Sequence, residues 1–199
     1  MPYCTGDVFL GAATTNYAEG LDVEHNGFAN ASAGLDLVLA NYPDAEQLVV
    51  TGASAGSVPT PLFAGLAADR YPDTTDIVTF GDSSGAYPNV PAINETIGVL
   101  WGSTNVIPDW PVNEGLTAAD YSIPGLYVQT GLHAPNVRLA RFDYAFDSTQ
   151  AFFGGLAGVA ADELVTLIDE TEALAETSGS ELATFVAPGE GHTIMRSPE

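Results

Sequence analysis

The sequence predicts an α/β fold, a mostly parallel sheet with helices on both faces. Apolar, strand-like segments lie near residues 47–51, 76–80, 126–130, 137–142 and 182–187. Helix-like segments lie near residues 29–41, 55–70, 92–100, 148–158 and 161–177. Strands that alternate with helices are typical of a parallel sheet, because the connection between parallel strands is usually a helix. With 199 residues and 46% hydrophobic content the chain can bury a substantial core, so we assign residues 1–199 to one domain.

The first expected helix, near residues 29–41, carries aliphatic residues at helical spacing, and Asn30 or Ser32 could cap it. The residues expected to face the core are Leu35, Leu37, Val38 and Leu39.

The strand near residues 47–51 is followed by the pentapeptide GASAG at 52–56 and then by a long Ala- and Leu-rich segment. Ser54 therefore sits where a buried strand turns sharply into a helix. Small neighbours let strand and helix approach closely while the hydroxyl projects above the sheet. This is the pattern of a nucleophile elbow in an α/β-hydrolase, in which the amide of Ala55 can donate to an oxyanion.

The next strand, near residues 76–80, runs into Asp82, and a helix is expected near residues 92–100. Residues 102–124 are the least regular stretch and are long for a loop, so we expect a lid or a pocket wall there. Trp101 and Trp110 could line an acyl pocket, but ordinary packing is the simpler expectation.

A hydrolase of this class needs an acid after the serine and a histidine after the acid. Asp147 follows the strand near residues 137–142 and precedes the helix near residues 148–158, so it is the preferred acid. Its carboxylate would hold the imidazole tautomer and stabilise the imidazolium. Asp82 and Asp143 are the alternatives.

The last expected helix, near residues 161–177, has an apolar stripe of Leu164, Leu167 and Ile168. Its acidic residues, expected in water, are Asp162, Glu163, Asp169 and Glu170. After the final strand, the loop PGEGHT at 188–193 would return His192 to the serine.

The other two histidines fit the base less well. His25 precedes the serine, and we expect it to be a hydrogen-bonded polar residue beside Asn26. His133 lies in a turn-like stretch with too little sheet after it. His192 is therefore the expected base.

With these residues in place, the chain resembles the pectin acetylesterase family, which includes the Notum carboxylesterases, and most closely its bacterial and archaeal branch. The matching motifs are YCTGD at 3–7, HNGF at 25–28, TGASAG at 51–56, DSSG at 82–85, FDSTQ at 146–150 and GHTI at 191–194. The resemblance implies an α/β-hydrolase-like fold and ester hydrolysis by a triad of Ser54, Asp147 and His192. It also implies an extracellular or cell-surface location, and O-acetyl groups of a polysaccharide or a lipid-like acyl ester as substrate.

The chain departs from this family at both ends. The family has a Gly-rich segment before the Tyr-Cys motif, which supplies oxyanion amides and a cysteine, and a closing helix beyond residues 196–199. The sequence is therefore expected to be a partial hydrolase domain, incomplete at both ends. Cys4 is most simply a buried small apolar residue; the resemblance suggests instead a disulfide partner in the missing part.

Charge is the second strong feature: four arginines, no lysine and 26 acidic residues give a net charge of −22. Such a surface repels itself at low ionic strength, and molar salt screens the repulsion, so we interpret it as adaptation to high salt. Nucleic acid is disfavoured as a partner. No membrane span, metal site or cofactor is expected, because long apolar runs and Cys/His ligand spacings are lacking.

The sequence therefore favours a serine esterase acting on a small-molecule or polysaccharide ester. The alternative is a catalytically silent hydrolase-like domain that binds a carbohydrate or a partner. Cleavage of a peptide or thioester by the same residues stays open, because the elbow does not encode the leaving group. The sequence does not indicate the oligomeric state.

Overall fold

The computed structural model of the chain describes residues 3–195. The expectations that concern the two ends fall partly on residues 1–2 and 196–199, which lie outside the described residues. A four-stranded sheet forms the centre, and its strands are β3 (Gln47–Ala53), β4 (Asp76–Asp82), β5 (Leu139–Tyr144) and β6 (Leu182–Ala187). They are hydrogen-bonded in the order β3-β4-β5-β6, and all pairs are parallel. The α/β class predicted from the sequence is confirmed.

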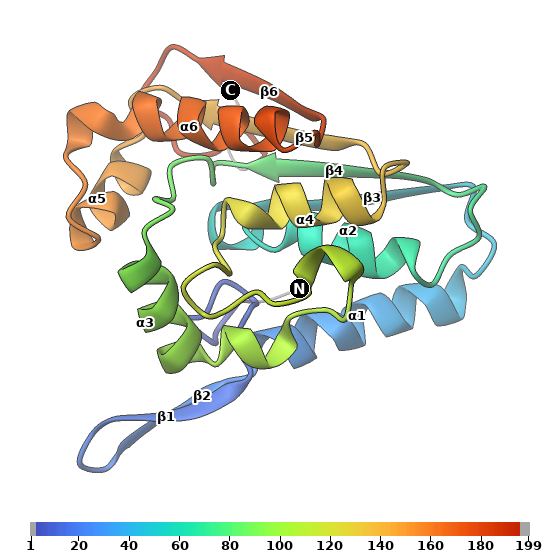
Figure 1. Ribbon diagram of the computed structural model, residues 1–199, viewed down its shortest axis with the longest axis horizontal. Coiled ribbons are helices and arrows are strands. Elements are labelled where there is room, and N and C mark those ends of the chain that lie inside the picture. Colours follow the sequence, from blue (N-terminus) through green and yellow to red (C-terminus); the bar gives the residue numbers. More distant parts are fainter. Residues whose placement is uncertain (1–2, 196–199) are drawn as a thin grey trace.

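Helices connect the parallel strands, as this topology requires. The α-helices are α1 (Gly27–Asn41), α2 (Thr60–Ala68), α3 (Pro91–Trp101), α4 (Gly125–His133), α5 (Ser148–Leu156) and α6 (Leu164–Thr177). Short 3₁₀ turns are η1 (Ser54–Gly56), η2 (Ser103–Val106), η3 (Pro111–Asn113) and η4 (Ala161–Glu163). An antiparallel hairpin of β1 (Ala13–Ala18) and β2 (Leu21–His25) projects from the body (Figure 1).

The elements differ from the expectations in three ways. The segment near residues 126–130 is not a strand but part of α4, whose buried residues recur at helical spacing. The hairpin of β1 and β2 was not expected at all. The helix after the elbow begins at Thr60 rather than near residue 55, because prolines at 59 and 61 lack the N–H of an uninterrupted helix.

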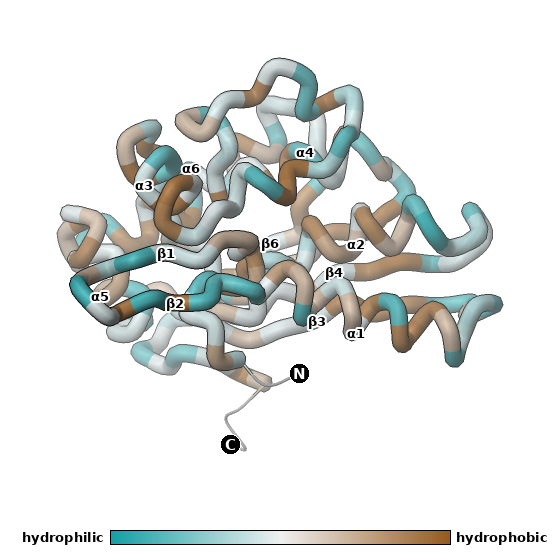
Figure 2. The backbone as a smooth tube through the Cα atoms, turned by 90° about the horizontal axis from the view of Figure 1, so that it is seen from below, coloured by the Kyte–Doolittle hydropathy of each residue, from teal (hydrophilic) through white to brown (hydrophobic). Residues whose placement is uncertain are grey.

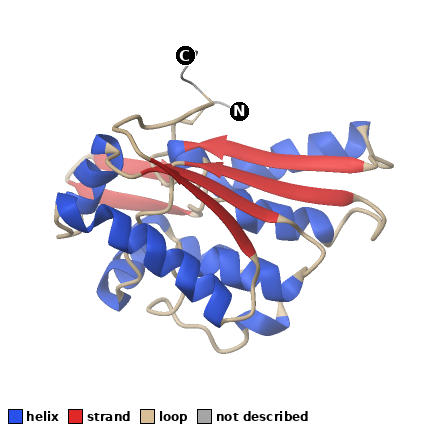
Figure 3. Ribbon diagram, turned by 90° about the horizontal axis from the view of Figure 1, so that it is seen from above, coloured by secondary structure: helices blue, strands red, loops and turns tan. Residues whose placement is uncertain are grey.

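Helices α2, α4 and α6 lie together on one face of the sheet (Figures 1 and 3). The alternating pattern along β4 agrees with this, because Ile77 and Thr79 are buried between more exposed neighbours. On the opposite face Val49 is 55% exposed and Phe185 is 65% exposed. The expected covering of both faces is therefore not seen in residues 3–195.

The core has two main clusters, both involving α2 and α4. One joins the sheet to the helices, with Ile77, Leu139 and Tyr127 among its members. The other joins Leu62 and Leu126 to the segment of residues 102–124. This segment is therefore packed into the body rather than free above it, and the hydropathy of the chain in Figure 2 shows the apolar character of α2.

The first helix differs in detail from its expectation. Leu35 and Leu39 pack against the core, but Leu37 is 66% exposed and Val38 is 37% exposed. The helix begins at Gly27 after Asn26, so neither Asn30 nor Ser32 is its N-cap. In α6 the prediction is confirmed, because Leu164 and Ile168 are buried and Leu167 packs beside them.

Membrane crossing by one helix is not supported in the described residues: no single helix there is long and apolar enough. The pair Ser148–Leu156 with Ala161–Thr177 passes the same test together, by length and composition only, and is bent by 117°.

Candidate active site

Ser54 stands at the carboxyl end of β3, as the first residue of η1. Its φ is +57°, a left-handed conformation that a serine adopts only under constraint. Gly52 explains how the sharp turn is possible, because a Cβ there would lie 2.0 Å from the Gly56 carbonyl oxygen. The strand and the turn are thus closer than any side chain at residue 52 would allow. The predicted geometry of an elbow is present.

The structure brings the three expected residues of the triad together. The Ser54 Oγ lies 2.7 Å from His192 Nε2, and His192 Nδ1 lies 2.8 Å from Asp147 Oδ2. Ser54, Asp147 and His192 come from the carboxyl ends of β3, β5 and β6, which lie along the same edge of the sheet (Figure 3). In open parallel sheets this edge is where sites are usually found.

The Asp147 carboxylate is completely buried and serves as the N-cap of α5. Its Oδ1 accepts hydrogen bonds from the backbone N–H groups of Thr149, at 2.9 Å, and Gln150, at 3.0 Å. Its Oδ2 faces His192. Bonds from N–H groups and the positive end of the helix both favour a negative charge at this position. The arrangement suits a carboxylate that orients an imidazole.

Since the carboxylate of Asp147 accepts only, the Nδ1 of His192 carries the proton that joins them. The neutral ring then has its free electron pair on Nε2, directed at Ser54. A base adjacent to a hydroxyl, itself oriented by a third group, is the arrangement that activates a serine. Ala55, the expected oxyanion donor, is the second residue of η1 and follows the serine directly.

The loop that carries His192 is fitted closely against the sheet. A Cβ at Gly191 would lie 2.7 Å from the ring of Tyr144, so only glycine lets the chain pass there. The Phe146 N–H donates to the Gly189 carbonyl at 3.0 Å, and this bond ties the loop to the segment before Asp147. The two segments that bring the base and the acid are therefore joined directly.

Asp82, one alternative acid, holds the same loop from the other side. Its buried carboxylate accepts hydrogen bonds from the backbone N–H groups of Ile194, at 3.1 Å, and Met195, at 2.9 Å. Next to it, the Ser83 hydroxyl donates to the His192 carbonyl. Asp82 thus contacts the backbone after the histidine and not its ring, so it supports the base rather than replacing Asp147.

Asp143, the other alternative acid, belongs to a buried ion pair. Its Oδ2 lies 2.7 Å from the Nε of Arg141, and both side chains are at most 1% exposed. Burial raises the pKa of the Asp143 carboxyl, and the nearby guanidinium of Arg141 opposes that shift. Gly85 lies directly over this pair, because a Cβ there would be 2.4 Å from Asp143 Oδ2. Asp143 makes no hydrogen bond or ion pair with His192; it is joined to Asp147 through the amide of Gln150.

The remaining histidines lie elsewhere. His25 is buried, and it bonds to the Thr5 carbonyl at 3.0 Å and to the Tyr17 hydroxyl at 2.9 Å, as expected of a satisfied polar residue. His133 ends α4, where it stacks on Trp110 and lies 2.6 Å from Asp69. The buried Trp110 therefore has the ordinary packing role that was expected of it.

The YCTGD motif at residues 3–7 and the HNGF motif at residues 25–28 meet at Asp7, for which the sequence predicted no role of its own. The Asp7 carboxylate is completely buried and accepts from the backbone N–H groups of Gly27, at 2.8 Å, and Phe9, at 3.1 Å. The Phe9 ring lies near Gly56 of the elbow, 4.0 Å from where a Cβ would stand. Asp7 thus fixes the turn that lies against the elbow.

Cys4 does not follow its expectation. It is exposed rather than buried, and it has no disulfide within the described part of the chain. Nor does any cluster of three or more His, Cys, Asp or Glu suitable for a metal ion occur in residues 3–195.

Comparison with known proteins adds no assignment: no protein-family model and no curated protein matches the chain.

Proposed function

We propose that the chain is a serine esterase of the α/β-hydrolase type, similar to pectin acetylesterases and Notum carboxylesterases. The observation that carries the proposal is the continuous hydrogen-bonded line from Asp147 through His192 to Ser54, with distances of 2.8 and 2.7 Å. A serine, a histidine and a buried aspartate rarely meet with this geometry unless the hydroxyl is to be activated.

The proposed reaction has two halves. The Ser54 oxygen attacks the ester carbonyl carbon while its proton passes to His192 Nε2, and the Ala55 amide donates to the negative oxygen. The tetrahedral intermediate collapses, the proton goes from His192 to the leaving alcohol, and an acyl-serine remains. Water then repeats the sequence, giving a carboxylic acid and free Ser54. Throughout, Asp147 stays ionised and stabilises the imidazolium.

By the same resemblance, the substrate proposed is an O-acetyl group on a polysaccharide or a lipid-like acyl ester, outside the cell or at its surface. The second candidate function is a silent hydrolase-like domain that only binds a carbohydrate or a partner. The 2.7 Å contact between Ser54 Oγ and His192 Nε2 favours the first, because binding alone does not require a base beside a serine hydroxyl.

A fluorophosphonate probe separates the two functions, because it forms a stable adduct only with an activated serine. In molar KCl the wild-type chain should form one adduct on Ser54, located by mass spectrometry, and should hydrolyse short or long acyl esters. Ser54→Ala and His192→Ala should lose both properties while the circular dichroism spectrum stays unchanged.

Ser178→Ala provides the matched control. Ser178 ends α6, which leads into the amino end of β6, the edge of the sheet opposite to the triad. This variant should keep the adduct and the turnover. A folded wild-type chain with neither adduct nor Ser54-dependent turnover would exclude the esterase and favour the silent domain.

A further inference from the structure

Gln150, in the first turn of α5, bridges two buried carboxylates. Its Nε2 lies 3.0 Å from Asp143 Oδ1 and 3.1 Å from Asp147 Oδ2, and its Oε1 accepts from the Ala86 N–H at 3.1 Å. The side chain is only 7% exposed. One amide group therefore joins the aspartate of the triad to the buried ion pair beneath it.

The orientation of this amide follows from its partners. The Ala86 N–H can only donate and therefore needs the oxygen of Gln150, while an ionised carboxylate can only accept and needs the NH₂ group. That group has two protons, and each serves one aspartate. No other uncharged side chain of similar length offers two donors and an acceptor in one plane except asparagine, which is shorter by one methylene.

The contact completes the hydrogen bonding of Asp147. Its Oδ1 already accepts from the backbone of Thr149 and Gln150, and its Oδ2 already accepts from His192. With the Gln150 amide, each oxygen receives two hydrogen bonds, the number that its two lone pairs can accept. A carboxylate held at all four positions cannot rotate without breaking bonds, so the direction of Oδ2 toward the imidazole is fixed.

Asp143, the second aspartate that Gln150 contacts, is held in place by its own hydrogen bonds. Asp143 accepts from the Gly85 N–H at 2.8 Å and from Arg141 Nε at 2.7 Å, and Arg141 Nη2 donates to the Ile168 carbonyl at 3.2 Å. Gly85 has no room for a side chain over this pair. Asp143 therefore gives Gln150 a fixed point of attachment, tied to β5, α6 and the turn after β4.

We propose that Gln150 is a positioning residue for the triad: it holds the Asp147 carboxylate in the orientation that His192 requires, using the Arg141–Asp143 pair as its anchor. The effect of Gln150 on ester turnover rests on the proposed esterase function, but its effect on the proton at His192 Nδ1 does not. This difference permits a test that separates the two proposals.

The test compares Gln150→Met and Gln150→Glu with the wild type. Methionine keeps the length of the side chain but has neither the donors nor the acceptor. Glutamate keeps the acceptor for Ala86 and, when protonated, has a single donor for two aspartates. The control is Gln129→Met, since Gln129 is similarly buried, at 5%, but lies in α4 and makes no hydrogen bond with the triad.

The first measurement does not depend on activity. In the ¹⁵N-histidine-labelled chain, the proton on His192 Nδ1 should give a downfield resonance, because it is bonded to a buried carboxylate. We expect Gln150→Met to move this resonance or to lose it by exchange with water, and Gln129→Met to leave it in place. An unchanged resonance in folded Gln150→Met would overturn the positioning role.

The second measurement is kinetic. For esters, Gln150→Met should lower kcat by about 10- to 100-fold with little change in KM, since misplacement of a catalytic group acts on the chemical step. In Gln150→Glu, the buried carboxylates of Asp143 and Asp147 disfavour ionisation of the new side chain, which then has one donor for two aspartates. We therefore expect kcat of Gln150→Glu to lie between those of the wild type and Gln150→Met.

If Gln150 only supported α5, its variants would lower the stability but leave both the resonance and kcat in place, which would overturn the proposal. The two proposals can also fail separately. If the wild type lacks ester turnover but Gln150→Met still changes the His192 resonance, the positioning role is supported and the esterase is refuted.

Discussion

At the residue scale, two serines held at positive φ both contact His192. Ser54 has a φ of +57° and Ser83 a φ of +67°, and they directly follow the neighbouring strands β3 and β4. Ser54 meets the imidazole, whereas Ser83 donates to the backbone carbonyl of the same residue. Such conformations typically cost about 1–3 kcal/mol each and persist only where the surrounding structure enforces them. The other two non-glycine residues at positive φ in residues 3–195, Val8 and Phe9, lie in the turn beside the elbow.

The buried Asp82 leads to a prediction about the loop that carries this base. In Asp82→Asn the amide oxygen can accept from one backbone N–H, but the NH₂ group faces the other as donor to donor. One of the N–H groups of Ile194 and Met195 is then left unpaired, at a cost of about 1–3 kcal/mol in the free energy of unfolding, or the loop detaches. Ester turnover should fall in either case, measured as kcat beside urea unfolding curves.

Asp120→Asn is the control for that change. Asp120 also accepts from a backbone N–H, that of Thr117 at 3.0 Å, but it is exposed and caps a turn in the segment of residues 102–124. We expect it to keep the wild-type kcat. Wild-type turnover and stability in Asp82→Asn would show that the loop does not depend on Asp82.

A residue of the site can be predicted from the sequence when its neighbours in the chain identify it, and not when only a contact with a distant segment does. Ser54 was predicted because small residues flank it between a strand and a helix, and His192 because the chain has only three histidines and this one lies in a turn-forming loop after the last strand. Among Asp82, Asp143 and Asp147 the sequence already favoured Asp147, and the resemblance strengthened that choice, since each of the three follows or ends a strand. What separates them is the partner of each carboxylate: Asp82 bonds to backbone more than 100 residues away, and no local pattern encodes that.

At the scale of elements, the elbow depends on how closely β3 approaches the turn that follows it. The strand ends at Ala53, and η1 reverses the chain within three residues before α2 begins at Thr60. The Gly56 carbonyl consequently points at the Cα of Gly52 with no room between them. The approach sets the position of Ser54 relative to the sheet.

Gly52→Ala should therefore be strongly disruptive. The added methyl would lie 2.0 Å from the Gly56 oxygen and 2.4 Å from its carbonyl carbon, both backbone atoms that cannot move aside as a flexible side chain would. We expect a loss of about 1–3 kcal/mol or more in the free energy of unfolding, and loss of fluorophosphonate labelling at Ser54 in whatever fraction folds.

The comparison variant is Gly155→Ala in α5, where a Cβ meets nothing within 4 Å. Since alanine is a better helix former than glycine, this change should be neutral or stabilise by up to about 1 kcal/mol. Equal stability and labelling of Gly52→Ala and the wild type would mean that the elbow can open, contrary to the close approach described.

Helices and strands were predicted correctly where the local sequence has a clear apolar pattern. The strands of the central sheet are short segments rich in apolar residues, and their existence was predicted correctly for β3, β4, β5 and β6. The segment of α4 failed because Leu126, Tyr127 and Val128 are also good strand formers, and its buried pattern appears only once α2 and the sheet are in place. The hairpin has little burial, so its sequence carries almost no apolar alternation.

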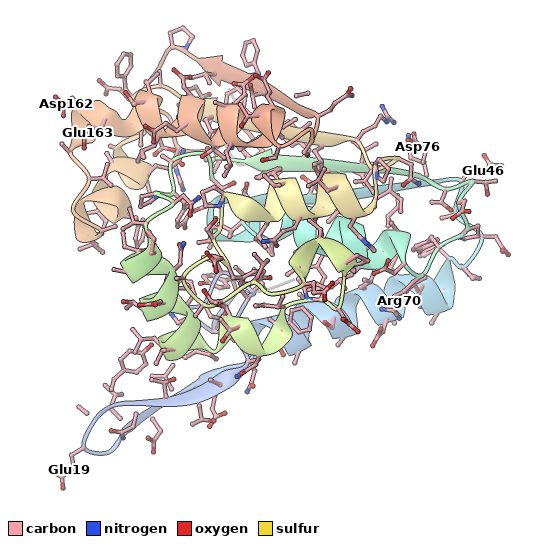
Figure 4. All side chains as sticks on the ribbon, in the orientation of Figure 1. Glu19, Glu46, Arg70, Asp76, Asp162 and Glu163 are labelled. Carbon is pink, nitrogen blue, oxygen red and sulfur yellow. The ribbon has the colours of Figure 1, made fainter. Side chains whose placement is uncertain are left out.

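At the scale of the whole molecule, three of the four arginines form ion pairs with aspartates. Arg141 is buried with Asp143, while Arg70 and Arg138 pair at the surface with Asp36 and Asp76. The fourth arginine is residue 196, outside the described residues. Most of the 26 acidic groups therefore have no basic side chain to pair with. Figure 4 shows the labelled carboxylates at the periphery, on the turn of the hairpin, where β3 and β4 begin, and on η4.

We therefore expect stability to depend strongly on salt. With a net charge of −22, folding brings like charges together, and this repulsion acts over a distance of about 10 Å at 0.1 M salt but only about 3 Å at 1 M. Urea unfolding in KCl from 0.05 to 2 M should give a free energy of unfolding that rises with salt, and Ser54 labelling should rise with it.

Salt can also stabilise proteins by strengthening apolar burial, so the test needs a variant with fewer charges. The variant is Glu19→Gln, Glu46→Gln and Asp162→Asn combined, at three exposed positions on different elements. If repulsion is the cause, the variant should be more stable than the wild type in dilute buffer and should gain less from KCl, so that the two curves converge near 2 M. Parallel curves would show that salt acts through burial and not through charge. Flat curves for both chains would mean that the acidic surface has no bearing on folding, and adaptation to salt would then have to be abandoned.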